Sequence, residues 1–181
     1  MITQERNRLK TAPEMLKAHI QAHIEFMQTQ LKALKVQVQA HICSDPGLSQ
    51  KLTLMTSIVG IGVASAAHIL AEIGTLEQFA SARQLAAYSG LTPQEHTSGS
   101  SVLGKTRLCK VGNPHLRKAL YFPALVAIRR CPVVTAFRER LLAAGKTKMQ
   151  AIGAVMHKLL RIIYGVLKSQ QPFDPNRLIA A

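Results

Sequence analysis

A run of serine and glycine residues near the middle of the chain is followed closely by cationic residues. Ser98-Gly99-Ser100-Ser101 precedes Lys105 and Arg107, and three further positions continue the cationic series: Lys110, Arg117 and Lys118. A serine hydroxyl can attack a phosphodiester to form a phosphoserine bond, and nearby cations stabilise the charge that develops on the phosphate. Guanidinium groups bind phosphate oxygens in pairs. The pattern therefore contains the components of a strand-breaking site, although serine–glycine tracts also serve as linkers.

Positive charge is concentrated in the second half of the chain. Residues 1–100 hold 8 Lys and Arg against 7 Asp and Glu, whereas residues 101–181 hold 15 against 2. Such a field repels itself unless a polyanion neutralises it, so we expect DNA or RNA as the partner. A membrane partner is disfavoured because Trp is absent and the basic helices need their apolar faces for the core. A simply soluble basic surface is the remaining alternative.

Metal and disulfide chemistry are not expected in this chain. The three cysteines are far apart and show neither zinc-ligand spacing nor a disulfide framework, and the nine acidic residues are scattered. No apolar leader follows Met1, and no apolar run is long enough to cross a bilayer. We therefore expect a cytoplasmic protein. Because aromatic residues are few, we expect its core to be aliphatic and built of packed helices.

The N-terminal segment, residues 1–46, is predicted to be one long coiled-coil helix. Thr11-Ala12-Pro13-Glu14 fits a capping box, and Ser44-Asp45-Pro46-Gly47 fits a terminating turn. Between them, residues 14–42 carry apolar side chains at heptad spacing and are predicted to form a homo-oligomer. A surface helix packed on its own domain is the alternative. The seam consists of Ile20, Ile24, Met27, Leu31, Leu34 and Val38.

Residues 47–175 are predicted to form a compact helical domain, followed by a tail at 176–181. It begins with helices at 48–57 and 63–73 around Val59-Gly60-Ile61-Gly62, which resembles a helix-hairpin-helix element. Gly60 and Gly62 would leave the backbone bare enough to approach a phosphate. An ordinary helical hairpin without a ligand is the alternative.

The rest of this domain alternates helices with one long loop. Residues 91–112 lack apolar periodicity, so we expect a loop containing a small β-hairpin around 101–108. Asn113-Pro114 is typical of a helix start, and Pro132 and Thr147 begin the next two helices. The predicted helices span 80–88, 113–130, 132–143 and 147–168. The expected fold class is mainly α.

Several ordered motifs together resemble a known family. They are Ile58-Val59-Gly60-Ile61-Gly62, Ala71-Glu72-Ile73-Gly74, the run from Arg83 to Pro93, Ser98-Gly99-Ser100-Ser101, and the run from Lys110 to Tyr121. In this order they resemble the C-terminal domain of IS-one-ten type transposases, which are related to the Piv/MooV DNA invertases. The resemblance covers about residues 50–175, and the preceding helix resembles the connecting coiled coil of that family.

The resemblance implies a mechanism and partners. Such bacterial proteins pair this domain with a RuvC-like domain, whose Asp-Glu-Asp-Asp site would bind Mg²⁺. They recombine DNA under the guidance of a structured RNA, which implies a nucleoid-associated protein. The family's serine nucleophile falls on Ser98, with Ser100 and Ser101 as the next choices, and we expect Lys105 and Arg107 to assist it electrostatically. Leu103 departs from the family, because members often carry a basic residue there.

The resemblance also bears on activity. Because no RuvC-like domain is found in the sequence, we expect a truncated transposase that is inactive alone. The alternative is a non-catalytic remnant that binds nucleic acid and oligomerises.

Overall fold

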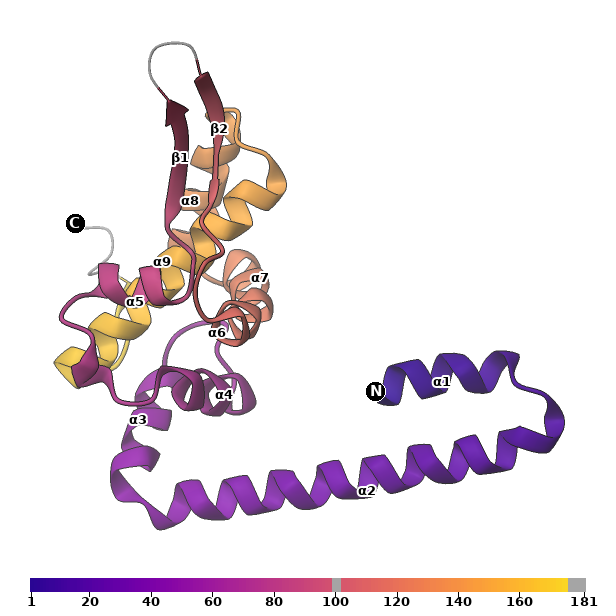
Figure 1. Ribbon diagram of the computed structural model, residues 1–181. Coiled ribbons are helices and arrows are strands. Elements are labelled where there is room, and N and C mark those ends of the chain that lie inside the picture. The colour runs from indigo at the N-terminus through magenta and orange to yellow at the C-terminus, as the bar shows by residue number, and fades with distance from the viewer. Residues whose placement is uncertain (99–101, 176–181) are drawn as a thin grey trace. The chain divides into compact units, whose positions relative to one another are not determined.

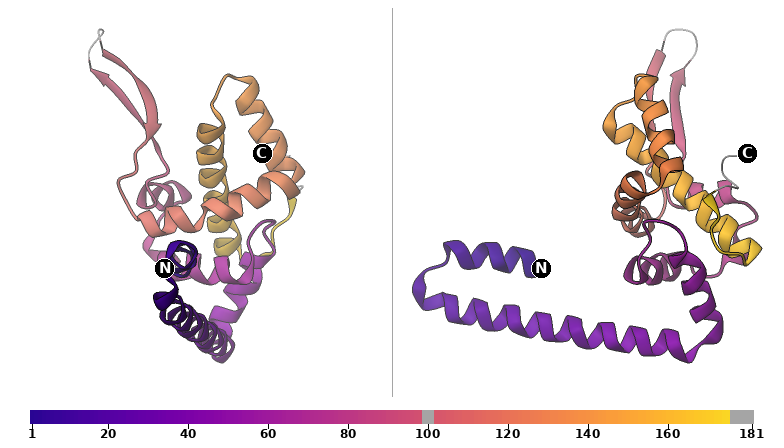
Figure 2. Two further views of the ribbon diagram at one scale, coloured as in Figure 1. Left: turned by 90° about the vertical axis from the view of Figure 1, so that its right-hand side faces the viewer. Right: turned by 180° about the vertical axis from the view of Figure 1, so that it is seen from behind.

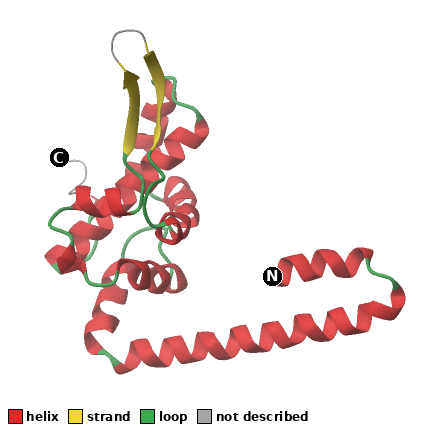
Figure 3. Cartoon of the chain, viewed as in Figure 1, coloured by secondary structure: helices red, strands yellow, loops and turns green. Residues whose placement is uncertain are grey.

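The computed structural model describes residues 1–98 and 102–175, and for residues 95–98 and 102–106 it describes the backbone alone. The chain is mainly helical with one two-stranded antiparallel sheet, which confirms the predicted fold class (Figures 1 and 3). It forms two compact units, Met1–Ser49 and Gln50–Ala181, here called unit 1 and unit 2.

Unit 1 is a pair of helices rather than the single predicted one. Helix α1 (Ile2–Thr11) is followed by the 31-residue α2 (Glu14–Ser44). The predicted capping box is wrong, because Thr11 ends α1 and donates its hydroxyl hydrogen to the carbonyl of Arg8, while no side chain caps α2. Pro13 accounts for the break, since it forces the preceding Ala12 into an extended conformation.

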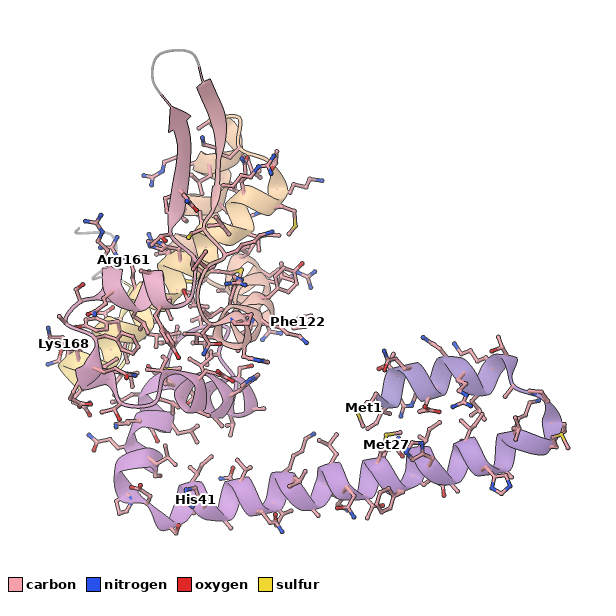
Figure 4. The ribbon with its side chains drawn as sticks, viewed as in Figure 1. Met1, Met27, His41, Phe122, Arg161 and Lys168 are labelled. Atoms are coloured by element: carbon pink, nitrogen blue, oxygen red, sulfur yellow. The ribbon has the colours of Figure 1, made fainter. Side chains whose placement is uncertain are left out.

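Helix α1 covers only the first part of the apolar seam of α2. Ile20 and Ile24 are buried in this unit, and Met27 projects toward the end of α1 that bears Met1 (Figure 4). The second part of the seam is open, with relative exposures of 44% for Leu31, 55% for Leu34 and 50% for Val38. The first half of the seam is therefore covered by α1, and the second half is exposed and could pack against another helix.

The chain continues through α3 (Pro46–Thr56), α4 (Val63–Ile73), the short 3₁₀ helix η1 (Leu76–Gln78) and α5 (Ala82–Tyr88). Asp45 begins α3 by accepting hydrogen bonds from the amides of Gly47 and Leu48, at 2.8 and 3.1 Å. Gly74, at φ +64°, ends α4, a conformation that favours glycine. Helix α4 has the predicted bounds.

Strands β1 (Pro93–Ser98) and β2 (Val102–Leu108) form a hairpin that is longer than predicted. Helices α6 (Pro114–Ala119) and α7 (Tyr121–Arg130) follow, where the sequence predicted one helix. That prediction is wrong because the chain breaks at Leu120. Pro123 explains the break, since it has no N–H group to continue the hydrogen-bond ladder of α6.

Helices α8 (Pro132–Ala143) and α9 (Lys148–Ser169) complete unit 2. Thr147 and Gln150 form a reciprocal capping box at the start of α9. Val155, Leu160 and Ile163 of α9 are almost completely buried, and α5, α7 and α8 pack against this helix (Figure 2). Helix α9 is the central core element of unit 2.

By length and composition alone, α9 is also apolar enough to cross a membrane. However, 61% of its most apolar window is buried inside the protein. Burial of this kind is what the core helix of a soluble domain shows.

Candidate nucleic-acid interface and serine-bearing hairpin

The base of the hairpin is a close crossing of two backbone segments. The amide of Lys110 donates to the carbonyl of Gly90 at 3.0 Å, and the amide of Asn113 donates to the carbonyl of Tyr88 at 2.7 Å. Gly90 and Gly112 have φ values of +68° and +132°. A Cβ atom at Gly112 would collide with the carbonyl oxygen of Tyr88. Only glycine permits this crossing, which fixes where both strands leave the helices.

Asn113 connects three helices at this base. Its Oδ1 accepts hydrogen bonds from the first two free amides of α6, those of His115 and Leu116, at 2.9 and 3.0 Å. Its Nδ2 donates to Oε2 of Glu72 in α4 at 2.9 Å and to the hydroxyl of Tyr88 in α5 at 3.2 Å. The predicted helix cap at Asn113 is therefore confirmed, and the same side chain also joins α4 and α5 to α6.

Arg117 adds a second connection to the hairpin base. Its Nη1 donates to the carbonyl of Ser89 at 2.8 Å, and the side chain is half-buried. The neighbouring Lys118 and Lys110 are exposed, as is Arg107 at the lower end of β2. Arg117, one of the cations predicted to stabilise a bound phosphate, thus donates a hydrogen bond inside the protein, whereas these three neighbours face solvent.

The hairpin carries Ser98 away from this base. Pro93 pairs with Leu108 at the base, and Ser98 pairs with Val102 at the far end of β1. At about 3.3 Å per residue, the five steps from Pro93 to Ser98 place the serine backbone roughly 17 Å from the base. Figures 1 and 2 show the hairpin projecting from the helices of unit 2. Its far end is therefore held at a distance from the helical core.

The strand register shows how far along the hairpin Lys105 and Arg107 lie from Ser98. Arg107 pairs with Gln94 near the base, so it lies near the opposite end of the hairpin from Ser98. Lys105 lies between them on β2. Ser100 and Ser101 fall outside the described residues. Lys105 is consequently nearer to Ser98 along the hairpin than Arg107 is.

The two glycines of the turn between α3 and α4 have different surroundings. At Gly60, φ is +102°, and an added Cβ would lie 2.6 Å from the carbonyl oxygen of Pro123 and 2.9 Å from the amide nitrogen of Ala127. Gly60 therefore allows α7 to pack closely on the turn. Gly62 precedes α4 with φ −88°, and an added Cβ would meet no atom within 4 Å. Of the two predicted phosphate contacts, only Gly62 is exposed to a possible ligand.

His68 lies on the surface of α4 and not in the core. Its side chain is 53% exposed on α4, with Nε2 at 3.6 Å from Oε1 of Glu72. Sequence reasoning did not identify Glu72 and Tyr88 as partners of Asn113. All three residues lie in the family motifs, which was the signal that the sequence offered. That Asn113 bonds to Glu72 and Tyr88 can be seen only in the three-dimensional fold.

Among the residues that the structure describes, no group of three or more His, Cys, Asp or Glu side chains could hold a metal ion. The described residues therefore do not fit a Mg²⁺ site. The family resemblance places that site in the RuvC-like domain.

The middle of the chain matches a known family of proteins. Residues 52–139, which include the hairpin and its glycine crossing, match the model of the transposase IS116/IS110/IS902 family. The chain belongs to the IS116/IS110/IS902 transposase family. The motifs that meet at the hairpin base, from Glu72 to Arg117, all lie within the matched region.

Relatives extend this family likeness over most of the chain. The pilin gene-inverting protein of Moraxella bovis is 35% identical over 174 residues, which is 96% of this chain and 54% of that protein. A probable family 20 transposase of Pseudomonas aeruginosa is 30% identical over 158 residues, covering 84% and 45%. A protein of insertion element IS110 in Streptomyces coelicolor is 31% identical over 139 residues, covering 77% and 33%. The chain thus spans about half, or less, of the length of these relatives.

Proposed function

We propose that this transposase-family chain acts in DNA recombination, with unit 2 binding DNA and Ser98 serving as the nucleophile. The observation that carries the proposal is the 35% identity with a pilin gene-inverting protein over 96% of the chain. The structure supports it with a hairpin that is anchored at its base by Asn113 and Arg117 and ends at Ser98. The charge of residues 101–181 supports a polyanionic partner.

In the proposed step, the hydroxyl oxygen of Ser98 attacks the phosphorus of a DNA phosphodiester. The serine O–H proton passes to a base or to solvent, and the bond from phosphorus to the departing sugar oxygen breaks. The departing sugar oxygen gains a proton, and the phosphate stays attached to the strand and to Ser98 as a diester. Attack by another sugar hydroxyl on this phosphoserine reverses the process and joins a new strand. Lys105 and the other cations of unit 2 stabilise the charged phosphate.

We propose that the other catalytic groups lie in a separate RuvC-like domain. That domain would supply Mg²⁺, and a structured guide RNA would direct the complex to its DNA. Because catalytic groups must be held in a productive geometry, the chain alone should bind DNA without cutting it. The experiment is a cleavage assay with a RuvC-like domain and guide RNA supplied in trans. The proposal expects cleavage by the wild-type chain and none by Ser98→Ala.

A second candidate function is non-catalytic binding by an oligomer. The exposed seam half at Leu31, Leu34 and Val38 favours it, because apolar side chains at heptad spacing are typical of a helix that pairs with another. In this case a second copy of α2 covers the seam, and the dimer binds DNA through two copies of the basic unit 2. Failure of every reconstituted wild-type complex to cleave DNA would favour this function.

A further inference from the structure

A groove with a volume of about 710 Å³ runs along α9 in unit 2. Its other walls come from Phe137 in α8, Ala82 in α5 and the segment after α9 that contains Phe173 and Asp174. We call it the α9 groove. Neither the hairpin nor Asn113 and Arg117 line it, so it is separate from the serine-bearing hairpin. Its volume lies in the range of sites that bind small organic ligands.

One stripe of α9 forms the floor of the α9 groove. The stripe consists of Ala154, Lys158, Arg161, Gly165 and Ser169, spaced 4, 3, 4 and 4 residues apart, which places them on one side of the helix. An added Cβ at Gly165 would meet no atom within 4 Å. Figure 4 shows Arg161 and Lys168 along the same part of α9, with Phe122 on the other side of unit 2. The floor thus places two adjacent cations, Lys158 and Arg161, between small residues, and it is open at Gly165.

One cation of the α9 groove, Lys158, and the neighbouring Arg140 lie over the ring of Phe137. The Nζ of Lys158 lies 4.6 Å from the centroid of the Phe137 ring, and the Cζ of Arg140 lies 5.5 Å from it. Burial, followed by the charge of Arg140, lowers the pKa of Lys158. Burial and then the charge of Arg161 lower the pKa of His157. A bound anion would reduce this crowding of positive charge.

The acidic residue that lines the α9 groove is Asp174, near Phe173. The Nζ of Lys158 lies beside the ring of Phe137, so the cationic end of the groove lies at this ring. An anion is therefore expected to bind at this end.

We propose that the α9 groove binds one unpaired nucleotide of a single nucleic-acid strand. The phosphate contacts Lys158 and Arg161, and the base stacks on the face of Phe137 that Lys158 leaves when it turns to the phosphate. Cations beside an aromatic ring are the usual means by which proteins hold single strands. A paired base cannot reach this ring inside a groove, which distinguishes the site from a duplex-binding surface. The inference deepens the proposed function and rests on nucleic acid being the partner of this chain.

The test uses the full chain and fluorescence anisotropy with labelled oligodeoxythymidine, oligouridine and a DNA duplex. The double variant Lys158→Gln/Arg161→Gln should bind the single strands at least about tenfold more weakly. The control Lys146→Gln/Lys148→Gln removes the same charge outside the groove and should cost about threefold or less. The oligonucleotide with the higher affinity identifies the strand as DNA or RNA.

The variant Gly165→Leu tests the cavity without changing charge. Its side chain enters open space in the α9 groove, so circular dichroism should show an intact fold while single-strand affinity falls and duplex affinity does not. Equal losses in the two double variants, or unchanged single-strand binding by Gly165→Leu, would overturn the groove proposal. Absence of duplex binding by the wild-type chain would instead overturn the proposed function, so the two failures are distinct.

Discussion

The Nδ2 atom of Asn113 lies 2.9 Å from Oε2 of Glu72, and this hydrogen bond joins residues that are 41 positions apart in the chain. The same side chain caps α6 and donates to the hydroxyl of Tyr88. Because the strands leave the helical core next to this point, the side chain of Asn113 helps to fix the position of the hairpin, together with the glycine crossing and Arg117.

We expect Asn113→Ala to lower the free energy of unfolding of unit 2 by about 2–4 kcal/mol, since it removes a helix cap and leaves polar partners without their hydrogen bond. Thr147→Ala is the matched control because its cap hydrogen bonds are made with Gln150 in the first turn of α9 itself. That control should cost about 1 kcal/mol. Urea unfolding followed by circular dichroism measures both, and equal costs would show that the bonds to Glu72 and Tyr88 contribute little.

The two glycines before α4 should respond differently to alanine. Gly60→Ala should destabilise unit 2 by about 3 kcal/mol or more, because the new Cβ would meet the backbone of α7 at a positive φ. Gly62→Ala should cost only about 0.5–1 kcal/mol, the difference between Gly and Ala at a helix cap. If the start of α4 contacts a phosphate, Gly62→Ala should also weaken duplex binding in anisotropy. Unchanged binding would remove Gly62 from the interface.

Local sequence signals predicted much of the fold. Glycine and proline at helix ends placed α4 and α8 correctly, and Asn113 and Thr147 were identified as caps. Local signals failed where tertiary structure decides. The polar helix α1 is stabilised by packing against Ile20 and Ile24, and the hairpin base depends on Gly112 crossing Tyr88.

The candidate site was only partly predictable for the same reason. Family motifs led to the prediction of Ser98, which stays a prediction, whereas the register that separates Arg107 from Ser98 follows from strand pairing. The α9 groove needs residues from α5, α8 and α9 together, although the spacing of Ala154, Lys158 and Arg161 on one helical stripe was visible in the sequence.

The open half of the α2 seam predicts self-association. Leu31→Lys would place a charge in the seam between two copies and should dissociate the oligomer, because an unpaired buried charge is strongly unfavourable. Val36→Lys is the matched control, since Val36 is 63% exposed and lies off the seam. Light scattering after size exclusion should show a monomer for Leu31→Lys and the wild-type mass for Val36→Lys. A monomeric wild-type chain would show that the seam does not pair.

Stability should fall as the pH is lowered from about 7 to 5, because His157 has a lowered pKa in the folded protein. The unfolded chain, with an imidazole pKa of about 6.5, then binds the proton more readily than the folded chain does. Lys158, Arg161 and Asp174 line the same groove, and the charge of Arg161 acts directly on His157. Urea midpoints across this range should depend less on pH in His157→Gln. An unchanged pH dependence would show that other groups cause it.

Duplex binding should be strongly salt-dependent and should depend on unit 2. With about six phosphate contacts, affinity should fall by about 10³ between 50 and 200 mM salt, as counterion release requires. Arg129→Gln/Arg130→Gln, at the exposed end of α7, should reduce the salt slope by about 2. The matched control Lys32→Gln/Lys35→Gln lies on exposed positions of unit 1 and should leave the slope nearly unchanged. A flat salt response of the wild-type chain would contradict nucleic-acid binding by this surface.

The most direct measurement is mass spectrometry of the covalent product formed on a DNA substrate that traps the cleaved strand. The wild-type chain is combined with a RuvC-like domain and guide RNA, digested, and searched for a nucleotide-bearing peptide. We predict a phosphodiester on Ser98 that Ser98→Ala abolishes and that Ser100→Ala and Ser101→Ala retain. A modification on Ser100 or Ser101, or cleaved DNA without any protein adduct, would contradict Ser98 as the nucleophile.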